Sequence, residues 1–441
     1  MTKEQISGYQ LFMLSTILYM AGAMGSLFKT LAEVSKQDAW FNFIFSMLYA
    51  WLIAYLLYRL GAAYPGKNMF EICEAACGKW LGRLVNVIVL FYVLHLLVRD
   101  LRMFGDFIGT SVLQRTPTEF IYLSSVLLLI YYATGNVEEF TRSVNLLFPV
   151  ILSSLLLLPF LLANEMDFSR VQPMLAQGPG AIVKGGALST GWAGEIFVFG
   201  AFLNYLGSSR QFYVSLKFGI VSSTILLTVL MLLHMTVLGA PTTARAMYPI
   251  FTLSEQINIT DFMDRLDVVM LGFWMPSYFM KMILLYFCLM AGLSSMLGTG
   301  KMRGINVMSG WFALMLTLVS FKSVMEVYRF GSYASFPITL IVQFCFFACV
   351  MTGMLLRNRG KRKRSRLPGG SAATTAGGWA MIAVALAALF IGSYTGHLYK
   401  LYGIIGAWVY AAALAGSVTF NALDFWRSNR IVRKPAGGRQ P

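Results

Sequence analysis

Two ionisable residues, Glu195 and Lys281, interrupt long apolar stretches of the sequence. A charged side chain in such a stretch is costly to bury, so it usually has a partner, a ligand or a proton to exchange. Glu195 could bind a ligand ammonium, exchange a proton, or cap a half-helix near its N-terminus. Lys281 could neutralise a carboxylate, occupy the position of a cation, or extend to the outer water interface. The sequence leaves these alternatives open for both residues.

A second polar group lies toward the outer end of the third apolar stretch. Its members are spaced 4, 3 and 4 residues apart and therefore share one helix face: His95, Arg99, Arg102 and Asp106. This spacing predicts either an ion-paired stripe at the level of the lipid headgroups or a polar wall of an outward vestibule. His234, in the seventh stretch, is expected to be a packing residue.

Glycine clusters mark two of the apolar stretches. The first stretch contains Gly22 and Gly25, and the sixth contains Gly191, Gly194 and Gly200. Each glycine weakens a helix by about 1 kcal/mol relative to alanine. A first and a sixth span with such interruptions are typical of a five-plus-five inverted repeat, which has broken helices and a ligand site at the bilayer midplane. Close helix packing through small residues is the alternative.

The composition identifies the solvent in which these residues act. Of 441 residues, 57% are hydrophobic and 12% are charged, and the mean hydropathy is +0.66. A soluble fold could not hide so much apolar surface, so the chain is predicted to be an integral membrane protein. This excludes a cytosolic enzyme, a disordered protein and a secreted disulfide scaffold.

No catalytic or metal-binding constellation is apparent in the sequence. There is no nucleophile–base pair or phosphate loop, and the five cysteines lack the neighbours of a zinc set and are interpreted as apolar filler. We therefore expect that the protein is not an enzyme and uses no cofactor or metal.

Apolar stretches long enough to cross a bilayer, which takes about 20 residues, recur along the chain. Ten fall in the main body, at roughly 9–28, 40–60, 84–105, 119–134, 143–163, 188–206, 213–239, 268–297, 304–321 and 333–356. Two more lie near 376–395 and 402–423. We predict an all-α membrane protein in three regions: a ten-helix permease-like core (1–357), a basic, Gly/Ser-rich cytoplasmic linker (358–375), and an extra transmembrane hairpin with a basic tail (376–441).

The distribution of Lys and Arg predicts the orientation. When the spans are alternated across the membrane, the whole net charge of +16 falls on the side of the N-terminus. Positive loops stay in the cytoplasm, so both termini are expected there. The basic tail is accordingly interpreted as an orientation signal, and no nucleic-acid partner is expected.

Short motifs between residues 38 and 267 resemble one known family, in their order and spacing rather than singly, and the resemblance extends over about 350 residues. They are Asp38-Ala39-Trp40, Gly78-Lys79-Trp80-Leu81-Gly82, Arg115-Thr116-Pro117, the segment VQPMLAQGPGAIVKGG, Leu238-Gly239, Tyr248-Pro249-Ile250 and Asp264-Arg265-Leu266-Asp267. The chain resembles the spore germination permease family, the B subunit of nutrient germinant receptors, within the amino acid/polyamine/organocation superfamily.

The resemblance implies a ten-helix inverted-repeat fold with a small-nutrient site formed by spans one, three, six and eight. It also implies assembly with an A subunit and a lipoprotein C subunit in the inner membrane of the spore. Two features depart from the family: Phe28-Lys29 stands where a Leu-Pro pair is usual, and the region after about residue 358 lies outside the resemblance.

The site is therefore expected to comprise residues from these four spans. They are Ala21, Gly22, Ala23, Met24, Gly25, Tyr92, Glu195, Phe199, Lys281 and Tyr286. Tyr286 lies about 140° around its helix from Lys281, so the two are not expected to face one narrow cavity.

Three functions follow from this sequence. The first is a membrane-embedded subunit that senses an amino-acid-like nutrient and triggers spore germination. The second is a self-contained amino acid transporter, coupled to protons. The third is a membrane scaffold, which the buried Glu195 and Lys281 disfavour. The expected partners are a small nutrient, membrane lipid, and the A and C subunits.

Overall fold

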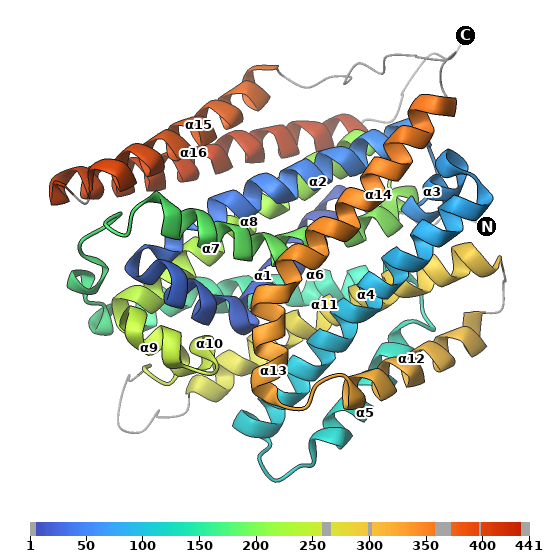
Figure 1. The fold of residues 1–441 in the computed structure, drawn as a ribbon, viewed down its shortest axis with the longest axis horizontal. Coiled ribbons are helices and arrows are strands. Elements are labelled where there is room, and N and C mark those ends of the chain that lie inside the picture. Colours follow the sequence, from blue (N-terminus) through green and yellow to red (C-terminus); the bar gives the residue numbers. More distant parts are fainter. Residues whose placement is uncertain (1–5, 258–265, 299–301, 358–371, 397, 434–441) are drawn as a thin grey trace.

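The computed structural model describes residues 6–257, 266–298, 302–357, 372–396 and 398–433 (Figure 1). Every regular element within these ranges is a helix. In a bilayer, the helix satisfies each backbone group within its own segment, so long apolar runs fold this way. The predicted all-α architecture is confirmed.

Nine helical segments of the described residues are long and apolar enough to cross a membrane, and a bent α1 raises the number to ten. The long elements are α1 (Gly8–Ser35), α2 (Phe43–Ala63), α4 (Lys79–Phe107), α6 (Val137–Leu161), α7 (Pro179–Ala193) with the 3₁₀ helix η5 (Gly194–Tyr205), α8 (Ser209–Val237), α11 (Leu266–Leu297), α14 (Ser335–Arg357), α15 (Ala372–Thr395) and α16 (Lys400–Arg433). The apolar helices α5 (Thr118–Tyr132) and α12 (Met302–Val319) are shorter and coincide with the fourth and ninth predicted spans.

Short helices connect the long ones. They are η1 (Lys36–Phe41), α3 (Met69–Cys77), the π-helical turn η2 (Ile108–Val112), η3 (Ala163–Glu165), η4 (Phe168–Val171), α9 (Gly239–Arg245), α10 (Pro249–Ser254), α13 (Val324–Arg329) and the π-helical turn η6 (Phe330–Ala334). Asn68 and Glu71 form a capping box at the start of α3, so the loop after α2 ends at this residue pair.

Helix α1 runs through the middle of the bundle and bends there. The segments Gly8–Gly22 and Gly25–Phe41 make an angle of 57°. The bend falls at the glycines that mark the first span in the sequence. Because α1 contacts α6, α7, α8 and α11, its bend lies where several spans meet.

The sixth span changes its winding at the predicted position. It begins at Pro179 as an α-helix and becomes a 3₁₀ helix from Gly194 to Tyr205. Stretches of 3₁₀ helix longer than about four residues are uncommon, and one in the middle of a span often marks a functional position. The change occurs one residue before Glu195.

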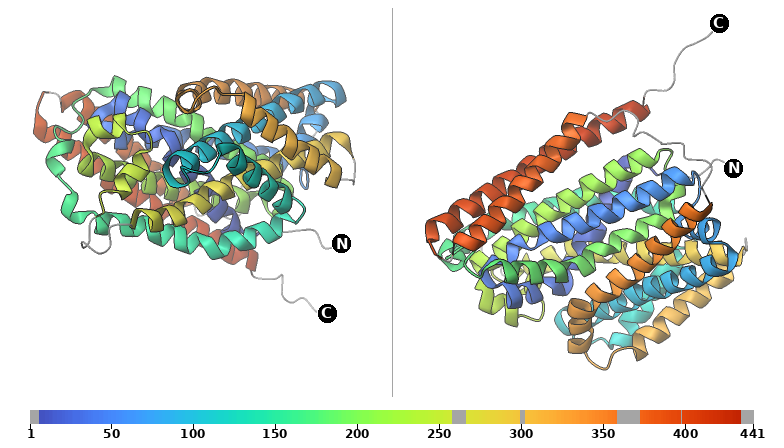
Figure 2. Two further views of the ribbon diagram at one scale, coloured as in Figure 1. Left: turned by 90° about the horizontal axis from the view of Figure 1, so that it is seen from below. Right: turned by 45° about the horizontal axis from the view of Figure 1, so that its top comes forward.

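The C-terminal helices α15 and α16 form a hairpin along one edge of the bundle (Figure 2). Helix α16 packs on α8, and Phe425 stacks on Phe218 with ring centroids 4.9 Å apart. Trp379 of α15 meets Trp51 of α2 edge to face at 5.1 Å. The hairpin is therefore joined to the core by direct packing; the basic tract at 361–366 lies outside the described residues.

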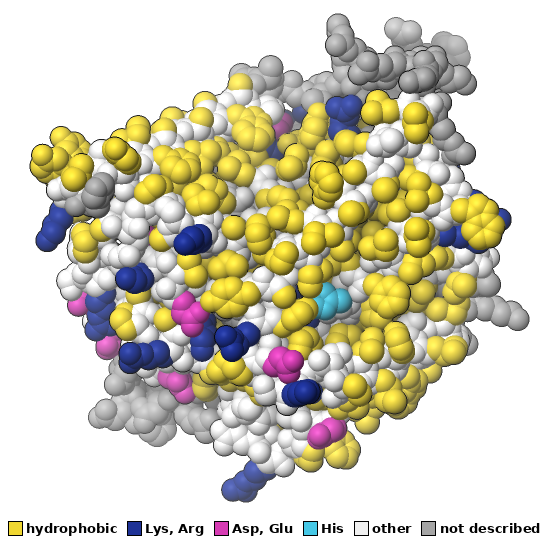
Figure 3. Space-filling view, viewed as in Figure 1, with side chains coloured by type: hydrophobic (Ala, Val, Ile, Leu, Met, Phe, Trp, Pro, Cys, Tyr) yellow, Lys and Arg dark blue, Asp and Glu magenta, His cyan; other side chains and the backbone are white. Residues whose placement is uncertain are grey.

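The surface matches the composition. Apolar side chains cover most of the face in Figure 3, and most of the charged ones gather in its lower left part. Large apolar side chains such as Leu146, Phe160 and Phe344 are about three-quarters exposed, at 76%, 77% and 74%. Contiguous exposed apolar surface on this scale indicates contact with lipid.

Candidate functional site

Four charged side chains meet in the core of the bundle. Arg99 Nη2 lies 2.7 Å from Asp100 Oδ1 and 2.6 Å from Glu195 Oε1. Lys281 Nζ lies 2.7 Å from Asp100 Oδ2 and 2.8 Å from Glu195 Oε2. We call these four residues the charge cluster. Each cation contacts both carboxylates, and the formal charges sum to zero.

Three elements supply the charge cluster. Arg99 and Asp100 are on α4, Glu195 is at the start of η5, and Lys281 is on α11. All four side chains are at most 1% exposed. A buried ion pair is stable only while its partners remain, and loss of one partner costs about 3–5 kcal/mol. The cluster therefore ties three spans together through groups that must stay paired.

Arg99 and Lys281 are held differently within the cluster. Arg99 donates aligned hydrogen bonds to both carboxylates and, through Nη1, to the Ser335 hydroxyl at 2.9 Å. Lys281 Nζ forms close ion pairs with the same two carboxylates and has no third polar partner among the described residues. Trp192 lies over both cations, with its ring centroid 3.9 Å from the Arg99 guanidinium and 4.8 Å from Lys281 Nζ. Of the two cations, Lys281 is the less constrained.

Gly22 allows the Lys281 ammonium to approach the bend in α1. A Cβ added at Gly22 would lie 2.6 Å from Lys281 Nζ and 2.9 Å from the Trp192 ring. Only glycine leaves room for this close approach. The contact therefore explains why position 22, one of the glycines of the first span, carries no side chain. The bend and the charge cluster are thus adjacent.

Helix α14 satisfies the carbonyl groups where the sixth span changes winding. The Gln343 side chain donates to the Gly194 carbonyl at 2.7 Å, and the Thr339 hydroxyl donates to the Gly191 carbonyl at 3.2 Å. The Tyr92 hydroxyl hydrogen-bonds with Thr339 at 3.1 Å. Buried carbonyl groups need such partners where a helix departs from α geometry.

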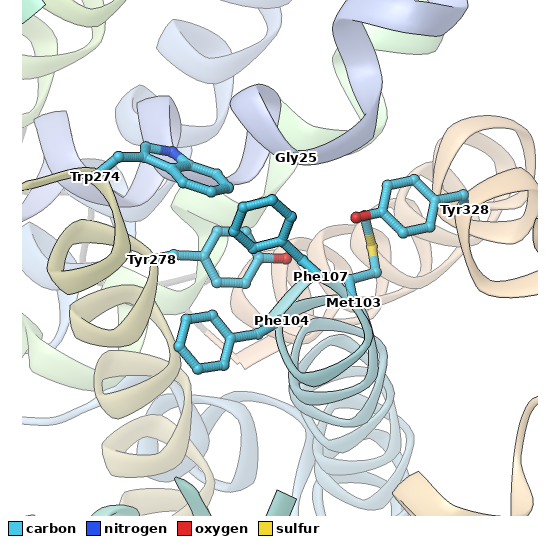
Figure 4. Close-up of a pocket in the computed structure, with 7 residues that line it drawn as sticks. All are labelled: Gly25, Met103, Phe104, Phe107, Trp274, Tyr278 and Tyr328. Atoms are coloured by element: carbon cyan, nitrogen blue, oxygen red, sulfur yellow. The ribbon is translucent and has the colours of Figure 1, made fainter. Parts of the chain in front are cut away.

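A pocket with aromatic walls lies beside the charge cluster (Figure 4). Its cavity volume is about 10 Å³, which is room for about one water molecule. Its lining comes from α1, α4, α11 and α13 and consists of Gly25, Met103, Phe104, Phe107, Trp274, Tyr278 and Tyr328. Tyr278 belongs to both sites, because its hydroxyl lies 3.4 Å from Asp100 Oδ1.

The structure brings some of the predicted site residues together. Glu195 and Lys281 meet in the charge cluster, Gly22 contacts it, and Gly25 lines the pocket. Tyr92 lies in the polar network of α14 described above. The alternative in which Lys281 extends to the outer interface is wrong, because its side chain is fully buried and paired.

Other predicted residues lie elsewhere or outside the description. The Tyr286 hydroxyl donates to the backbone carbonyl of Asn306 on α12, at 2.6 Å, so it faces away from Lys281 as the helix geometry predicts. Ala21 and Phe199 are fully buried, and Phe199 packs near Phe202. Ala23 and Met24 also belong to the predicted site, and their side chains lie outside the described residues.

The polar face predicted on α4 divides into two parts. Arg102 pairs with Asp106 at 3.1 Å near the C-terminal end of α4, as an ion-paired stripe would. Arg99 does not belong to such a stripe, because it is fully buried in the charge cluster. His234 is buried against Phe28, with ring centroids 4.8 Å apart, which confirms its packing role.

Sequence reasoning missed Asp100 and Trp192. Asp100 lies one residue from the predicted face, so the spacing that defines this face does not include it. Its position inside an apolar span was a sufficient signal, since an intramembrane acid needs a partner. Trp192 carries no such signal, because tryptophan is common in apolar spans. Among the described residues, no group of three or more His, Cys, Asp and Glu side chains could hold a metal ion.

A comparison with protein families identifies relatives. A family model described as "Spore germination protein" matches residues 5–327. The protein YfkT of Bacillus subtilis (strain 168) is 25% identical over 332 residues, which are 74% of this chain and 90% of YfkT. Spore germination protein KB of the same organism is 23% identical over 67% of this chain and 80% of its own length. Spore germination protein B2 of the same organism is 20% identical, over 76% of this chain and 92% of its own length.

Solved structures with the same fold are transporters. The chain superimposes with a TM-score of 0.64 on Mhp1, a nucleobase-cation-symport-1 family transporter in a closed conformation with bromovinylhydantoin bound. The sequences are 11% identical, and the match covers 96% of this chain and 94% of Mhp1. A Na⁺-coupled sialic acid symporter in an outward-open state gives a TM-score of 0.61 at 11% identity, over 95% and 90% of the chains.

The extent of the structural match with Mhp1 indicates whether the C-terminal hairpin belongs to the shared fold. A match over 96% of the chain is too extensive to leave out α15 and α16, so the hairpin is part of the shared fold. The family match covers the greater part of the chain from residue 5 to α13. This chain is therefore a member of the spore germination protein family and an integral, multi-pass membrane protein with a transporter fold.

Proposed function

We propose that this protein is the nutrient-sensing membrane subunit of a spore germinant receptor, which binds a small amino-acid-like molecule in the core of the bundle. The observation that carries the proposal is the charge cluster, which joins α4, η5 and α11 beside the bend in α1. The site proposed here keeps Glu195 and Lys281 from the sequence analysis and adds Arg99 and Asp100.

The neutrality of the charge cluster favours a ligand that carries both charges. A ligand with a net charge would leave one buried charge without a partner, which is costly. An ammonium group could replace Lys281 on one carboxylate, and a carboxylate could then pair with the released Lys281. Such an exchange preserves zero net charge and loosens the link between α11 and the other two spans. Ligand binding is thereby converted into helix movement.

Transport of the same ligand is the second candidate function. The TM-score of 0.64 with Mhp1 supports it, because the fold shared with a symporter is suited to alternating access. Uptake of a radiolabelled amino acid into proteoliposomes separates the two functions. A transporter accumulates the amino acid, whereas a sensor gives a germination response in spores without accumulation.

The proposal includes an assembly and an orientation. The partners are an A subunit and a lipoprotein C subunit, and the location is the inner membrane of the spore, with both termini in the cytoplasm. The distribution of the net charge of +16 supports this orientation. A cysteine introduced within residues 361–366 should resist thiol labelling from outside intact cells, and labelling there would overturn the orientation.

The test of the charge cluster uses Glu195→Gln, Lys281→Met and the double variant. Each single substitution leaves one uncompensated buried charge, so the membrane level of the protein should fall, by an amount set by about 3–5 kcal/mol of lost stability. The double variant restores neutrality and should recover the protein level without recovering the nutrient response. Germination is measured as the dose–response of spores to amino acids, with the protein level from an immunoblot.

A surface pair provides the matched control. Glu138 and Arg142 pair at 2.8 Å on the exposed start of α6, where a salt bridge contributes less than about 1 kcal/mol. Glu138→Gln should therefore leave both the protein level and the response unchanged. A wild-type dose–response in Glu195→Gln, at a wild-type protein level, would refute the function assigned to the cluster.

A further inference from the structure

Lys217 is a second lysine inside an apolar span, and it lies outside the charge cluster. Its side chain is 2% exposed, and it stands on α8, eight residues after the helix begins at Ser209. Its ammonium makes no ion pair or hydrogen bond with another described residue and lies 4.8 Å from the ring centroid of Trp51 on α2. A charge buried within a membrane needs a partner, so the surroundings of Lys217 indicate what this partner is.

The ends of α2, α8 and α16 meet at this part of the bundle. A Cβ added at Gly61, near the end of α2, would lie 3.6 Å from the hydroxyl of Ser209, where α8 begins. The Gln211 side chain of α8 donates to Asn429 Oδ1 of α16 at 2.9 Å. The 29 residues of α8 cover about 44 Å, close to the thickness of a bilayer with its headgroups. Helix side chains lean toward the N-terminal end, so the ammonium of Lys217 extends toward the headgroups on the side of the N-terminus.

Two arginines lie nearer the membrane surface than Lys217. Arg59 is on α2 and Arg210 is on α8, and the charges of both act on the Tyr58 hydroxyl. Arg210 Nη2 lies 3.6 Å from Asp424 Oδ1 of α16, and the same carboxylate acts on Lys217 from beyond ion-pair distance. We call Arg59, Arg210, Lys217 and Asp424 the basic cluster. Its three cations and one acid leave a net charge of +2, whereas the charge cluster is neutral.

Tyrosine rings of α2 and α8 accompany these cations. The rings of Tyr55, Tyr58 and Tyr213 meet one another with centroids 5.6, 6.1 and 6.2 Å apart. Tyr55 is 37% exposed, and its hydroxyl accepts a hydrogen bond from Arg59 Nη1 at 3.1 Å. Tyrosine is enriched where an apolar ring meets lipid and its hydroxyl meets the headgroups. The basic cluster is therefore reached from the lipid at headgroup level.

We propose that the basic cluster binds the phosphate group of an anionic phospholipid in the leaflet on the side of the N-terminus. Lys217 and Arg210 donate to the phosphate oxygens, which gives the buried ammonium its missing partner. The acyl chains lie along exposed apolar side chains of α2, such as Leu52. Basic sites between spans at headgroup level are typical of anionic lipid recognition. Because the cluster joins α2 and α8 to α16, the bound lipid fixes the C-terminal hairpin to the core; this inference is independent of nutrient binding.

The test compares ligands that differ in charge and in acyl chains. The full-length protein in a neutral detergent is titrated with phosphatidylglycerol, phosphatidylcholine or inorganic phosphate, and its Tm is measured. Phosphatidylglycerol should raise the Tm saturably and by more than phosphatidylcholine, because only the first has a net negative charge. Inorganic phosphate should have little effect, because it has no acyl chains to bury. Equal effects of the two lipids would overturn the proposal, and a full effect of inorganic phosphate would overturn the assignment to a lipid.

Three variants locate the site. Lys217→Met should raise the half-saturating concentration of phosphatidylglycerol by at least about tenfold, the effect of one hydrogen bond to a charged group. Lys79→Met removes an exposed lysine at the start of α4 and should leave the titration unchanged. Asp424→Asn raises the charge of the basic cluster and should lower the half-saturating concentration about fivefold, as expected for one charge near the membrane surface.

The two substitutions in the basic cluster act in opposite directions, so a general loss of stability cannot imitate both results. A wild-type titration of Lys217→Met would refute the site. If Lys217→Met does not fold, Asp424→Asn decides alone, and an unchanged or raised half-saturating concentration would refute the proposal.

Discussion

At the scale of single residues, the position of the Lys281 ammonium depends on the absence of a side chain at Gly22 of α1. The space it occupies exists because position 22 carries no side chain, and the Trp192 ring closes the same space from the other side. A charge buried in lipid must be held at ion-pair distance, so small changes in this space act on the whole charge cluster.

Gly22→Ala tests this dependence. The new Cβ would lie 2.6 Å from Lys281 Nζ and 2.9 Å from the Trp192 ring, so the ammonium and the ring must both shift. We expect a loss of roughly 1–3 kcal/mol in stability, as for other overpacked sites, and a weaker nutrient response. Unfolding of the detergent-solubilised protein measures the first effect, and spore dose–response the second.

Gly304→Ala is the control for that substitution. Position 304 is a helical glycine on α12 with no atom near the added Cβ, so alanine should be neutral or stabilising by up to about 1 kcal/mol. If both variants gain stability equally, close approach is not the reason for glycine at position 22.

At the scale of elements, the sixth span depends on α14. Its change from α to 3₁₀ winding leaves carbonyl groups that Gln343 and Thr339 satisfy from across the interface. The Tyr49 hydroxyl donates to Gln343 Oε1 at 2.8 Å and fixes which end of the amide faces Gly194. The position of Glu195 is therefore controlled by a helix about 150 residues away in sequence.

Gln343→Glu and Gln343→Leu test the hydrogen bonds of this amide, whose nitrogen also donates to the Tyr92 hydroxyl at 3.4 Å. Glutamate keeps an acceptor for Tyr49 but removes the donor to Gly194 and Tyr92, and leucine removes donor and acceptor. Loss of the donor should cost about 1–3 kcal/mol and speed amide hydrogen exchange in residues 191–205 for both variants. Phe344→Leu, at the adjacent lipid-facing position, should leave the exchange unchanged. Unaltered exchange in both Gln343 variants would mean that α14 does not support the winding change.

At the scale of the whole molecule, the C-terminal hairpin contacts a segment that links the first and sixth spans. Asp38, just after α1, accepts backbone hydrogen bonds from Leu175 at 2.7 Å and Gln177 at 3.1 Å, just before α7. The other side of this segment packs on the hairpin: a Cβ at Gly403 of α16 would overlap the Met174 carbonyl. The hairpin therefore helps to hold the ends of both interrupted spans.

Gly403→Val tests whether this contact matters for function. The side chain would displace residues 174–177 from Asp38, which should cost roughly 1–3 kcal/mol and raise the nutrient concentration needed for germination. Gly416→Val, on the same helix, would meet only the flexible Met381 side chain at 3.2 Å and serves as the control. Equal dose–response curves for the two variants and the wild type would show that the hairpin acts independently of the spans it contacts.

The sequence by itself determined the solvent, the positions of the spans and the two interruptions. These features follow from apolar run length and from glycine, which act locally through the needs of backbone in lipid. It also identified Glu195 and Lys281 as buried charges that require an explanation. Only the tertiary structure decided that each has two partners, that Asp100 completes the charge cluster, and that Tyr286 belongs to another interface. Those facts depend on which helix faces meet. Only the packing of the whole bundle brings together Arg99, Glu195 and Lys281, which lie about 90 positions apart from one to the next in the sequence.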